Sequence, residues 1–192
     1  MKKPMARLSV LAILALLLAL CLLATAGPAT AGTPKGAPSF TWYGGLSDFL
    51  DNGDWHPDCP AAGNLTVLHW RTSWSIQVRL PRETREQSWW IITDLNMVLL
   101  DKPDGTPGWH FHSGTSIWCS ENPLDYSWPL LPPTSSWLWT SKDTGVTTPA
   151  GVHYFIDDLT GWNQYKGLKA YGTWTMADPY FQDAVGKVWI RH

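Results

Sequence analysis

The segment Ser73–Leu80 alternates without a break between apolar and polar residues, and this period of two constrains the fold more than any other feature of the chain. The apolar positions are Trp74, Ile76, Val78 and Leu80, and the polar positions are Ser73, Ser75, Gln77 and Arg79. Successive side chains of an extended chain point to opposite faces, so the segment has one face for a core and one for solvent. The pattern predicts a β-strand.

Other segments of β character are separated by turn residues. The candidate strands are Asn64–Trp70, Trp89–Thr93, Leu95–Leu100, Thr115–Cys119, Trp137–Thr140, Val152–Asp157, Tyr171–Met176 and Val185–Arg191. The chain has 16 Gly and 15 Pro, which favours many turns. Short strands in this arrangement predict a sandwich or a barrel. For Pro81–Ser88, a helix and a polar hairpin loop are both compatible with the sequence.

The chain opens with the pattern of an export signal. Its parts are, in order, Lys2, Lys3, Arg7, the apolar run Leu8–Leu23 and the small-residue sites Ala24-Thr25-Ala26 and Ala29-Thr30-Ala31. The apolar run is shorter than the roughly 20 residues that a membrane-spanning helix needs. We therefore expect a signal peptide at 1–26, a flexible leader at 27–38, one domain at 39–192, a secreted (extracellular) location and no stable membrane anchor.

Two cysteines, Cys59 and Cys119, follow the signal. An exported chain meets an oxidising compartment, so a disulfide between them is expected; two thiols that never meet are the alternative. Three of the 14 Lys and Arg residues lie in the signal, and the remaining 11 are outnumbered by 16 Asp and Glu. This negative balance argues against nucleic acid as a partner.

The chain contains 14 tryptophans, which is far above ordinary usage. Most of them are expected to fill the core, because each indole buries a large area. Trp55, Trp109 and Trp162 lie instead beside Gly, Pro, Asp or Asn, in predicted loops. An exposed flat ring complements the flat face of a sugar, so these three are the candidate ligand-binding residues. The expected partner is a polysaccharide or another extracellular protein.

His110 and His112 flank Phe111, and on a strand their side chains point the same way. Together with His153 they form a candidate metal site. The pair, followed by Pro149–His153, resembles the two metal motifs of cupins, which are β-barrels that bind iron, manganese or zinc. This chain departs from that pattern: Ser116 and Ile117 stand where cupins carry a glutamate, and the second motif is one residue short.

Aspartates form two further clusters in the sequence. Asp51 and Asp54 lie in one, and Asp157 and Asp158 form the other. Carboxylate oxygens in turns suit calcium, which is abundant outside cells, so calcium is a possible ligand of these residues. Asp-rich turns without a metal are the alternative. No other cofactor is expected.

Two segments resemble the P domain, also called the Homo B domain, of subtilisin-like proprotein convertases. Asp94–Thr106 is similar to a strand and turn of that family, and Tyr171–Ile190, with its Gly-Thr-Trp-Thr, is similar to the closing segment. P domains are galactose-binding-like jelly rolls that support a protease and are not catalytic. The resemblance therefore implies an antiparallel β-sandwich of jelly-roll type.

These patterns favour a secreted, non-catalytic binding or accessory module with glycan as its ligand. No Gly-x-Ser-x-Gly motif indicates a serine nucleophile. A cupin-like metal enzyme that uses His110, His112 and His153 is the second hypothesis. A structural extracellular domain without a small ligand is the third.

Overall fold

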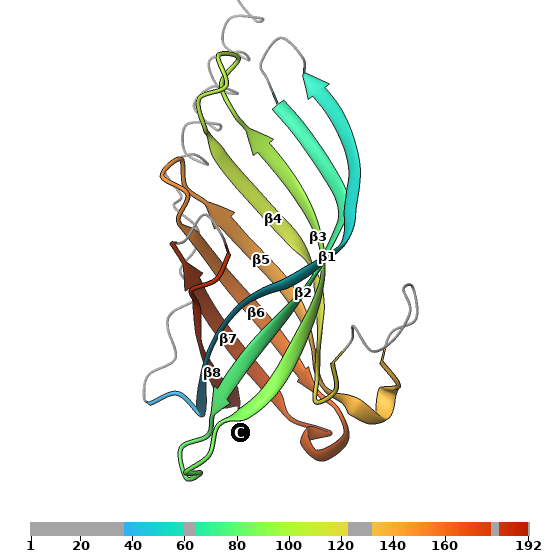
Figure 1. The fold of residues 1–192 in the computed structure, drawn as a ribbon, viewed down its shortest axis with the longest axis vertical. Helices are drawn as coiled ribbons and strands as arrows, with labels where there is room; N and C mark the ends of the chain where they lie inside the picture. The colour runs from blue at the N-terminus through green and yellow to red at the C-terminus, as the bar shows by residue number, and fades with distance from the viewer. Residues whose placement is uncertain (1–36, 60–63, 123–131, 178–180, 192) are drawn as a thin grey trace, which may run out of the picture. The chain divides into compact units, whose positions relative to one another are not determined.

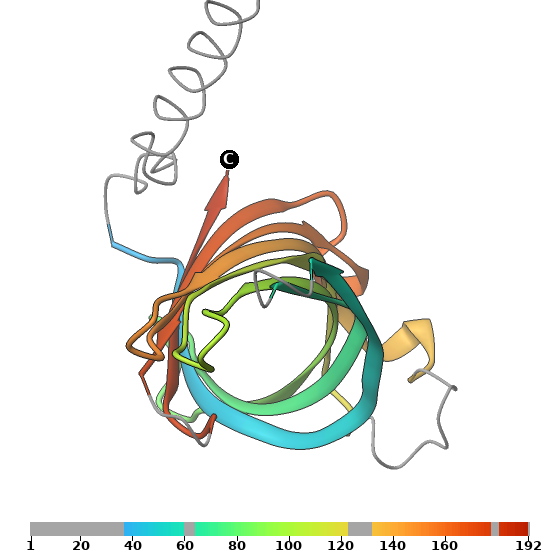
Figure 2. The same ribbon diagram turned by 90° about the horizontal axis from the view of Figure 1, so that it is seen from above.

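Antiparallel strands produce a closed ring in the computed structural model, which describes residues 37–59, 64–122, 132–177 and 181–191 (Figure 1). Each strand pairs antiparallel with the next one in the chain, and β1 closes the ring by pairing with β8 (Figure 2). The strands are β1 (Phe40–Cys59), β2 (Asn64–Arg79), β3 (Gln87–Leu100), β4 (Trp109–Cys119), β5 (Trp137–Thr147), β6 (His153–Gly161), β7 (Lys169–Met176) and β8 (Ala184–Arg191).

Within the described ranges, two single-turn 3-10 helices, η2 (Thr134–Ser136) and η3 (Asn163–Tyr165), accompany the strands. In the part of the chain that the structure describes, no helix is long and apolar enough to cross a membrane. The predicted signal peptide and residues 27–36 of the predicted leader lie outside the described residues.

The predicted jelly-roll sandwich is wrong, because the eight strands form a closed barrel. A jelly roll needs Greek-key crossovers between two sheets, whereas here every strand neighbours its successor. Alternation specifies that each strand has a buried face, and both folds satisfy that requirement. The resemblance to the P domain therefore implied the wrong fold. Its two segments correspond to the end of β3 with the following turn and to most of the β7–β8 hairpin.

The most regular predicted strand is confirmed within β2, where Trp74, Ile76 and Val78 are buried. The segment after it forms turns up to residue 86, so the polar loop and not the helix is present. Strand β1 was not predicted. Gly44-Gly45 and Asn52-Gly53 have the composition of turns, but they lie inside this long, irregular strand, which shifts register against β2 at three points.

The strands differ in length, so one side of the barrel wall is taller than the other. Strand β1 has 20 residues and β8 has 8. Only Phe40–Gly44 of β1 pairs with β8, and the rest of β1 pairs with β2 alone. Strands β1 to β4 therefore extend beyond β7 and β8 at one end of the barrel (Figure 1).

Aromatic side chains fill the other end, which we call the plugged end. Trp139 stacks on Tyr165 of η3 with ring centroids 4.8 Å apart. Phe40 meets the edge of Trp89 at 5.6 Å, and Val78 lies in the same buried cluster. These rings bury a large apolar area at the point where the barrel would otherwise be open.

The predicted disulfide between Cys59 and Cys119 is also wrong. Cys119 is a free, buried thiol at the plugged end. Across the sheet, the strand pairings lead from Cys119 through β3 and β2 to Gly45 of β1. Cys59 ends β1, 14 residues beyond Gly45. At about 3.3 Å per residue this is roughly 46 Å along the strand, whereas a disulfide joins Cα atoms about 5.5 Å apart. The side chain of Cys59 lies outside the described residues.

Candidate functional site

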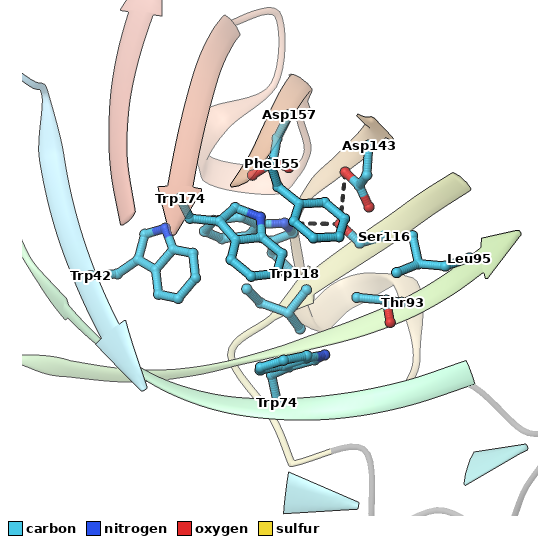
Figure 3. A pocket seen from close by; sticks show the side chains of 11 residues that line it. Trp42, Trp74, Thr93, Leu95, Ser116, Trp118, Asp143, Phe155, Asp157 and Trp174 are labelled. Atoms are coloured by element: carbon cyan, nitrogen blue, oxygen red, sulfur yellow. Dashed lines mark hydrogen bonds between the residues drawn. The ribbon is translucent and has the colours of Figure 1, made fainter. Parts of the chain in front are cut away.

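A small cavity lies inside the barrel above the aromatic plug (Figure 3). Inward-facing residues of seven strands line it: Trp42, Trp74, Ile91, Thr93, Leu95, Ser116, Trp118, Asp143, Phe155, Asp157 and Trp174. The volume in which the centre of a water molecule fits between these side chains is about 20 Å³. The cavity therefore has room for about one ordered water with the side chains as they stand.

Five aromatic rings form most of its wall. Trp42 lies 5.8 Å from Trp118 and 6.0 Å from Trp174, measured between ring centroids. Trp74 lies 5.7 Å from Trp174, and Phe155 stacks on Trp174 at 4.1 Å with the planes 5° apart. Each ring rests against another ring, so their positions are mutually constrained.

Two carboxyl groups reach the cavity from neighbouring strands. Asp143 of β5 and Asp157 of β6 are direct cross-strand partners, and their side chains are 5% and 2% exposed. A hydrogen bond joins the two groups. Burial raises the pKa of Asp143, and burial together with the nearby Asp143 raises the pKa of Asp157 well above its usual range. Two carboxyls in such contact share a proton, because both cannot ionise in this environment.

Hydroxyl groups determine which carboxyl carries the negative charge. Ser141 donates a hydrogen bond to Oδ1 of Asp143, and Ser116 lies 3.4 Å from the same oxygen. Ser116 in turn accepts the indole N–H of Trp118 at 3.2 Å and lies 2.5 Å from Ser141 Oγ. Hydrogen bonds to a carboxylate stabilise its ionised form. This arrangement favours an ionised Asp143 and a proton on Asp157.

Asp157 is held from β7 and keeps one oxygen without a partner. Trp174 makes a side-chain hydrogen bond to it. A Cβ atom at position 172 would lie 3.1 Å from Asp157 Oδ2. The glycine at this position therefore leaves room for the carboxyl group. Oδ1 of Asp157 is buried and has no hydrogen-bond partner among the described residues. A buried acceptor of this kind is costly unless something binds to it.

The three predicted histidines lie on inward-facing positions at the opposite end from the plug, which we call the histidine end. Thr147 bridges two of them, because its hydroxyl lies 2.7 Å from His112 Nε2 and 2.8 Å from His153 Nδ1. His110 is directed elsewhere and lies 2.9 Å from Asp101 Oδ1. Among the described residues, no group of three His, Cys, Asp or Glu side chains is arranged to hold a metal ion.

Burial keeps this pair of histidines neutral. It lowers the pKa of His112 to about 3, with a further contribution from the neighbouring His153 and His110. The pKa of His153 is lowered by burial and by His110. His112 also contacts the ring of Phe155 at 5.1 Å, so Phe155 lies between the histidine pair and the cavity.

The predicted ligand-binding tryptophans are exposed, but they do not form one surface. Trp55 is 54% exposed, Trp109 is 47% exposed and Trp162 is 38% exposed. Trp55 lies in the second half of β1 and Trp109 begins β4 near the histidine end, whereas Trp162 follows β6 at the plugged end. The indole of Trp162 also leans on Trp137, with centroids 5.2 Å apart. A single sugar chain cannot lie across all three as one flat platform.

The predicted calcium residues are not brought together. Asp157 points into the barrel, whereas Asp158 points outward and lies 3.3 Å from Arg191. Consecutive residues of a strand face opposite sides, so these two cannot share a cation. Asp51 accepts the N–H of Gly53 and lies 3.5 Å from Arg71. Asp54 is exposed on the same strand.

Sequence reasoning missed Asp143, Ser116 and Ser141, which form the centre of the site. A signal was present, because these residues fall at every second position with buried tryptophans: Ser116 with Trp118, and Ser141 and Asp143 with Trp139. Polar residues on the apolar face of a strand are unusual unless they are paired inside the fold. A scan against protein-family models, a search of curated proteins and a search of solved structures each found no match to this chain.

Proposed function

We propose that this chain is a secreted, non-catalytic binding protein that holds one small molecule inside its barrel. The observation that carries the proposal is the cavity, where five aromatic rings surround a few convergent polar groups and Asp157 Oδ1 has no hydrogen-bond partner in the part of the chain that the structure describes. Eight-stranded barrels either fill their interior or hold one small ligand there. Pockets for small molecules share this combination of an apolar wall and a few oriented polar groups. The export pattern at the N-terminus supports the secreted location.

The barrel interior is a better candidate site than the outer tryptophans. The interior rings are mutually constrained and adjoin a polar network, so the interior is preorganised for a ligand. Trp55, Trp109 and Trp162 lack such an arrangement, and glycan binding through them stays a separate prediction. The cupin-like hypothesis has less support, because His110 is paired with Asp101 instead of joining the other two histidines.

The present free space sets a condition on the ligand. Room for about one water means that a larger molecule enters only when a lining side chain moves. Phe155 is the side chain placed to do so, since it contacts Trp174 on one side and His112 on the other. Its rotation toward the histidine end would join the cavity to that end of the barrel.

The test is to look for a bound molecule and then to fill the cavity by substitution. Native mass spectrometry of the protein exported by its own producing cells should show one additional small mass per chain, and thermal-shift screening of a fragment library should give hits that quench tryptophan fluorescence. Ile91→Phe fills the cavity and should abolish both signals. Val185→Phe adds the same bulk on the outer wall, where Val185 is exposed, and serves as the control. Hits that bind the Ile91→Phe variant as well as the wild type would rule out the interior site.

A further inference from the structure

The charge of the cavity limits what it can bind. Its 11 lining residues include two carboxyl groups and no Lys, Arg or His. Burying a negative charge without a counter-charge is costly, and the pair avoids that cost by retaining a proton. A ligand that carried a carboxylate or phosphate into this space would place like charges in contact. The lining therefore excludes anions and disfavours ligands that offer only hydrogen-bond acceptors.

The hydrogen-bond donors around the two aspartates leave one carboxyl oxygen that can accept a hydrogen bond from a ligand. Ser141 and Ser116 donate hydrogen bonds to Asp143, and Trp174 donates one to Asp157. Oδ1 of Asp157 is the remaining buried oxygen, on a side chain that is 2% exposed and lines the cavity. The neighbouring side chains of Ser116 on β4 and Trp174 on β7 do not titrate. Tyr171 of β7 does titrate, and the charge of Asp157 contributes to its raised pKa. The group that binds here must be a hydrogen-bond donor.

The aromatic wall supplies the second half of the recognition. Trp42, Trp74, Trp118 and Trp174 surround the space from four strands (Figure 3). An indole face attracts a cation within about 6 Å of its ring, more strongly than the other aromatic side chains do, and the attraction grows when water is excluded. Aromatic cages of this kind, closed by an acidic group, suit an ammonium ion.

We infer that the cavity binds a small protonated amine, with its N–H donating to Asp157 Oδ1 and its positive charge enclosed by the tryptophan rings. This inference rests on the proposed function and names the ligand class of the same site. As the cation binds, the proton shared by Asp143 and Asp157 leaves to solvent, so the cavity exchanges one positive charge for another. Within the pH range in which the pair retains its proton and the amine is charged, affinity rises with pH.

The test compares probes of one size and different charge on the full exported protein. Methylammonium and ethylammonium are titrated by calorimetry and tryptophan fluorescence beside ethanol, as a neutral probe, and acetate, as an anion. The ammonium ions should bind at least about tenfold more tightly than ethanol, and acetate should not bind. Titration in two buffers of different ionisation enthalpy should show about one proton released for each cation bound, because the ligand replaces it.

A matched pair of variants locates the charge. Asp157→Asn keeps the shape of the side chain and should reduce ammonium affinity by at least about tenfold, with little effect on ethanol. Asp158→Asn removes the neighbouring outward carboxylate and should leave binding unchanged. The wild-type comparison of probes needs no variant, so it decides the question even if Asp157→Asn does not fold.

The outcomes separate the two proposals. Neutral probes that bind as well as ammonium ions, are lost in Ile91→Phe and are unaffected by Asp157→Asn would overturn the amine inference and leave the binding function standing. Absence of any co-purified molecule and of any bound probe, charged or neutral, would overturn the binding function itself.

Discussion

Trp118 and Trp139 are cross-strand partners on β4 and β5 and lie in one buried cluster, yet their surroundings differ. Both are buried almost completely. Trp139 stacks on Tyr165 and fills the plugged end, and no described residue accepts a hydrogen bond from its indole N–H. Trp118 donates its N–H to Ser116 and lines the cavity. Two neighbouring indoles thus act as filler in one place and as the wall of a site in the other.

The difference comes from what lies next to each ring along its own strand. Ser116 lies two residues before Trp118, so both side chains point inward. The serine accepts the indole N–H of Trp118 and donates a hydrogen bond to Asp143. Trp74 makes the same kind of bond to Thr72, two residues before it, at 2.8 Å. A hydroxyl two positions away holds the indole by its N–H, and this bond adds to the contacts that the ring makes with its neighbouring rings. The plug is held mainly by apolar packing, although Trp89 also donates its N–H to Gln87, whereas the cavity layer combines ring contacts with a buried polar network.

The largest expected effect is on the plug. Trp139→Ala should lower the free energy of unfolding by about 3–5 kcal/mol, because it removes a fully buried ring and leaves a void against Tyr165. Urea unfolding at neutral pH measures it. Trp162→Ala, on an exposed ring at the same end, should cost about 1 kcal/mol or less. Equal losses in the two variants would show that the plug does not stabilise the barrel as described.

Acid should destabilise the histidine end of the barrel, whereas it should not destabilise the plugged end. The folded pKa of His112 is about 3, below the value of about 6.5 in an unfolded chain, so only the unfolded state gains a proton as pH falls between these values. Stability is complete above pH 6.5 and declines below it, by at most about 5 kcal/mol from this residue. His112→Phe should flatten the decline in the thermal midpoint. Trp139→Ala removes packing in the plug, away from His112, and should lower the midpoint by a similar amount at every pH.

The acid pair should respond to pH in the opposite direction. The folded pKa of Asp157 is raised, so as pH rises above about 4 the unfolded chain releases a proton that the folded chain retains. This contribution to stability is present at low pH and is lost as pH approaches the folded pKa. Asp157→Asn cannot ionise and should remove that loss, whereas Asp158→Asn should follow the wild-type curve. Thermal midpoints from pH 4 to 8 would contradict the shared proton if all three proteins behaved alike.

Much of the wall could be predicted from the sequence, but its closure could not. Trp74, Ile76 and Val78 alternate with polar residues, and this alternation places them on a buried face whatever the strand pairs with. Pairing partners are set by contacts distant in the sequence, which one strand does not encode. Strand β1 was missed for a further reason. Its Gly44 lies against Ser75 and Ile76 of β2, where a side chain would meet backbone, so a residue typical of turns here allows close approach of strands.

Only part of the candidate site could be predicted from the sequence. His112 and His153 were predicted to face the same space, and Thr147 does join them, but the third histidine is held by Asp101. The pairing of Asp143 with Asp157 depends on the register of β5 against β6, which no local pattern shows. Asp157 was noted as half of an acidic pair with Asp158, and only the assignment of a strand separates the two faces.

The smallest expected effect concerns the third set of tryptophans, those on the outer surface. If Trp55, Trp109 and Trp162 bind a polysaccharide, each stacked ring should contribute on the order of 1 kcal/mol, giving weak binding after the cost of association. Pull-down on insoluble polysaccharides followed by calorimetry with soluble oligosaccharides measures it. Because Trp162 lies at the plugged end, Trp162→Ala and the double Trp55→Ala, Trp109→Ala variant should affect binding separately, each removing its own share.

Tyr154→Ala is the control for that series, since Tyr154 is an exposed ring on β6 that was not predicted to bind. A glycan that contacts the predicted rings should lose affinity in the tryptophan variants and keep it in Tyr154→Ala. If a broad panel of polysaccharides shows no binding, or if alanine at all three tryptophans leaves binding unchanged while the barrel stays folded, the outer rings carry no glycan site. The binding role would then be confined to the tryptophans that line the cavity inside the barrel.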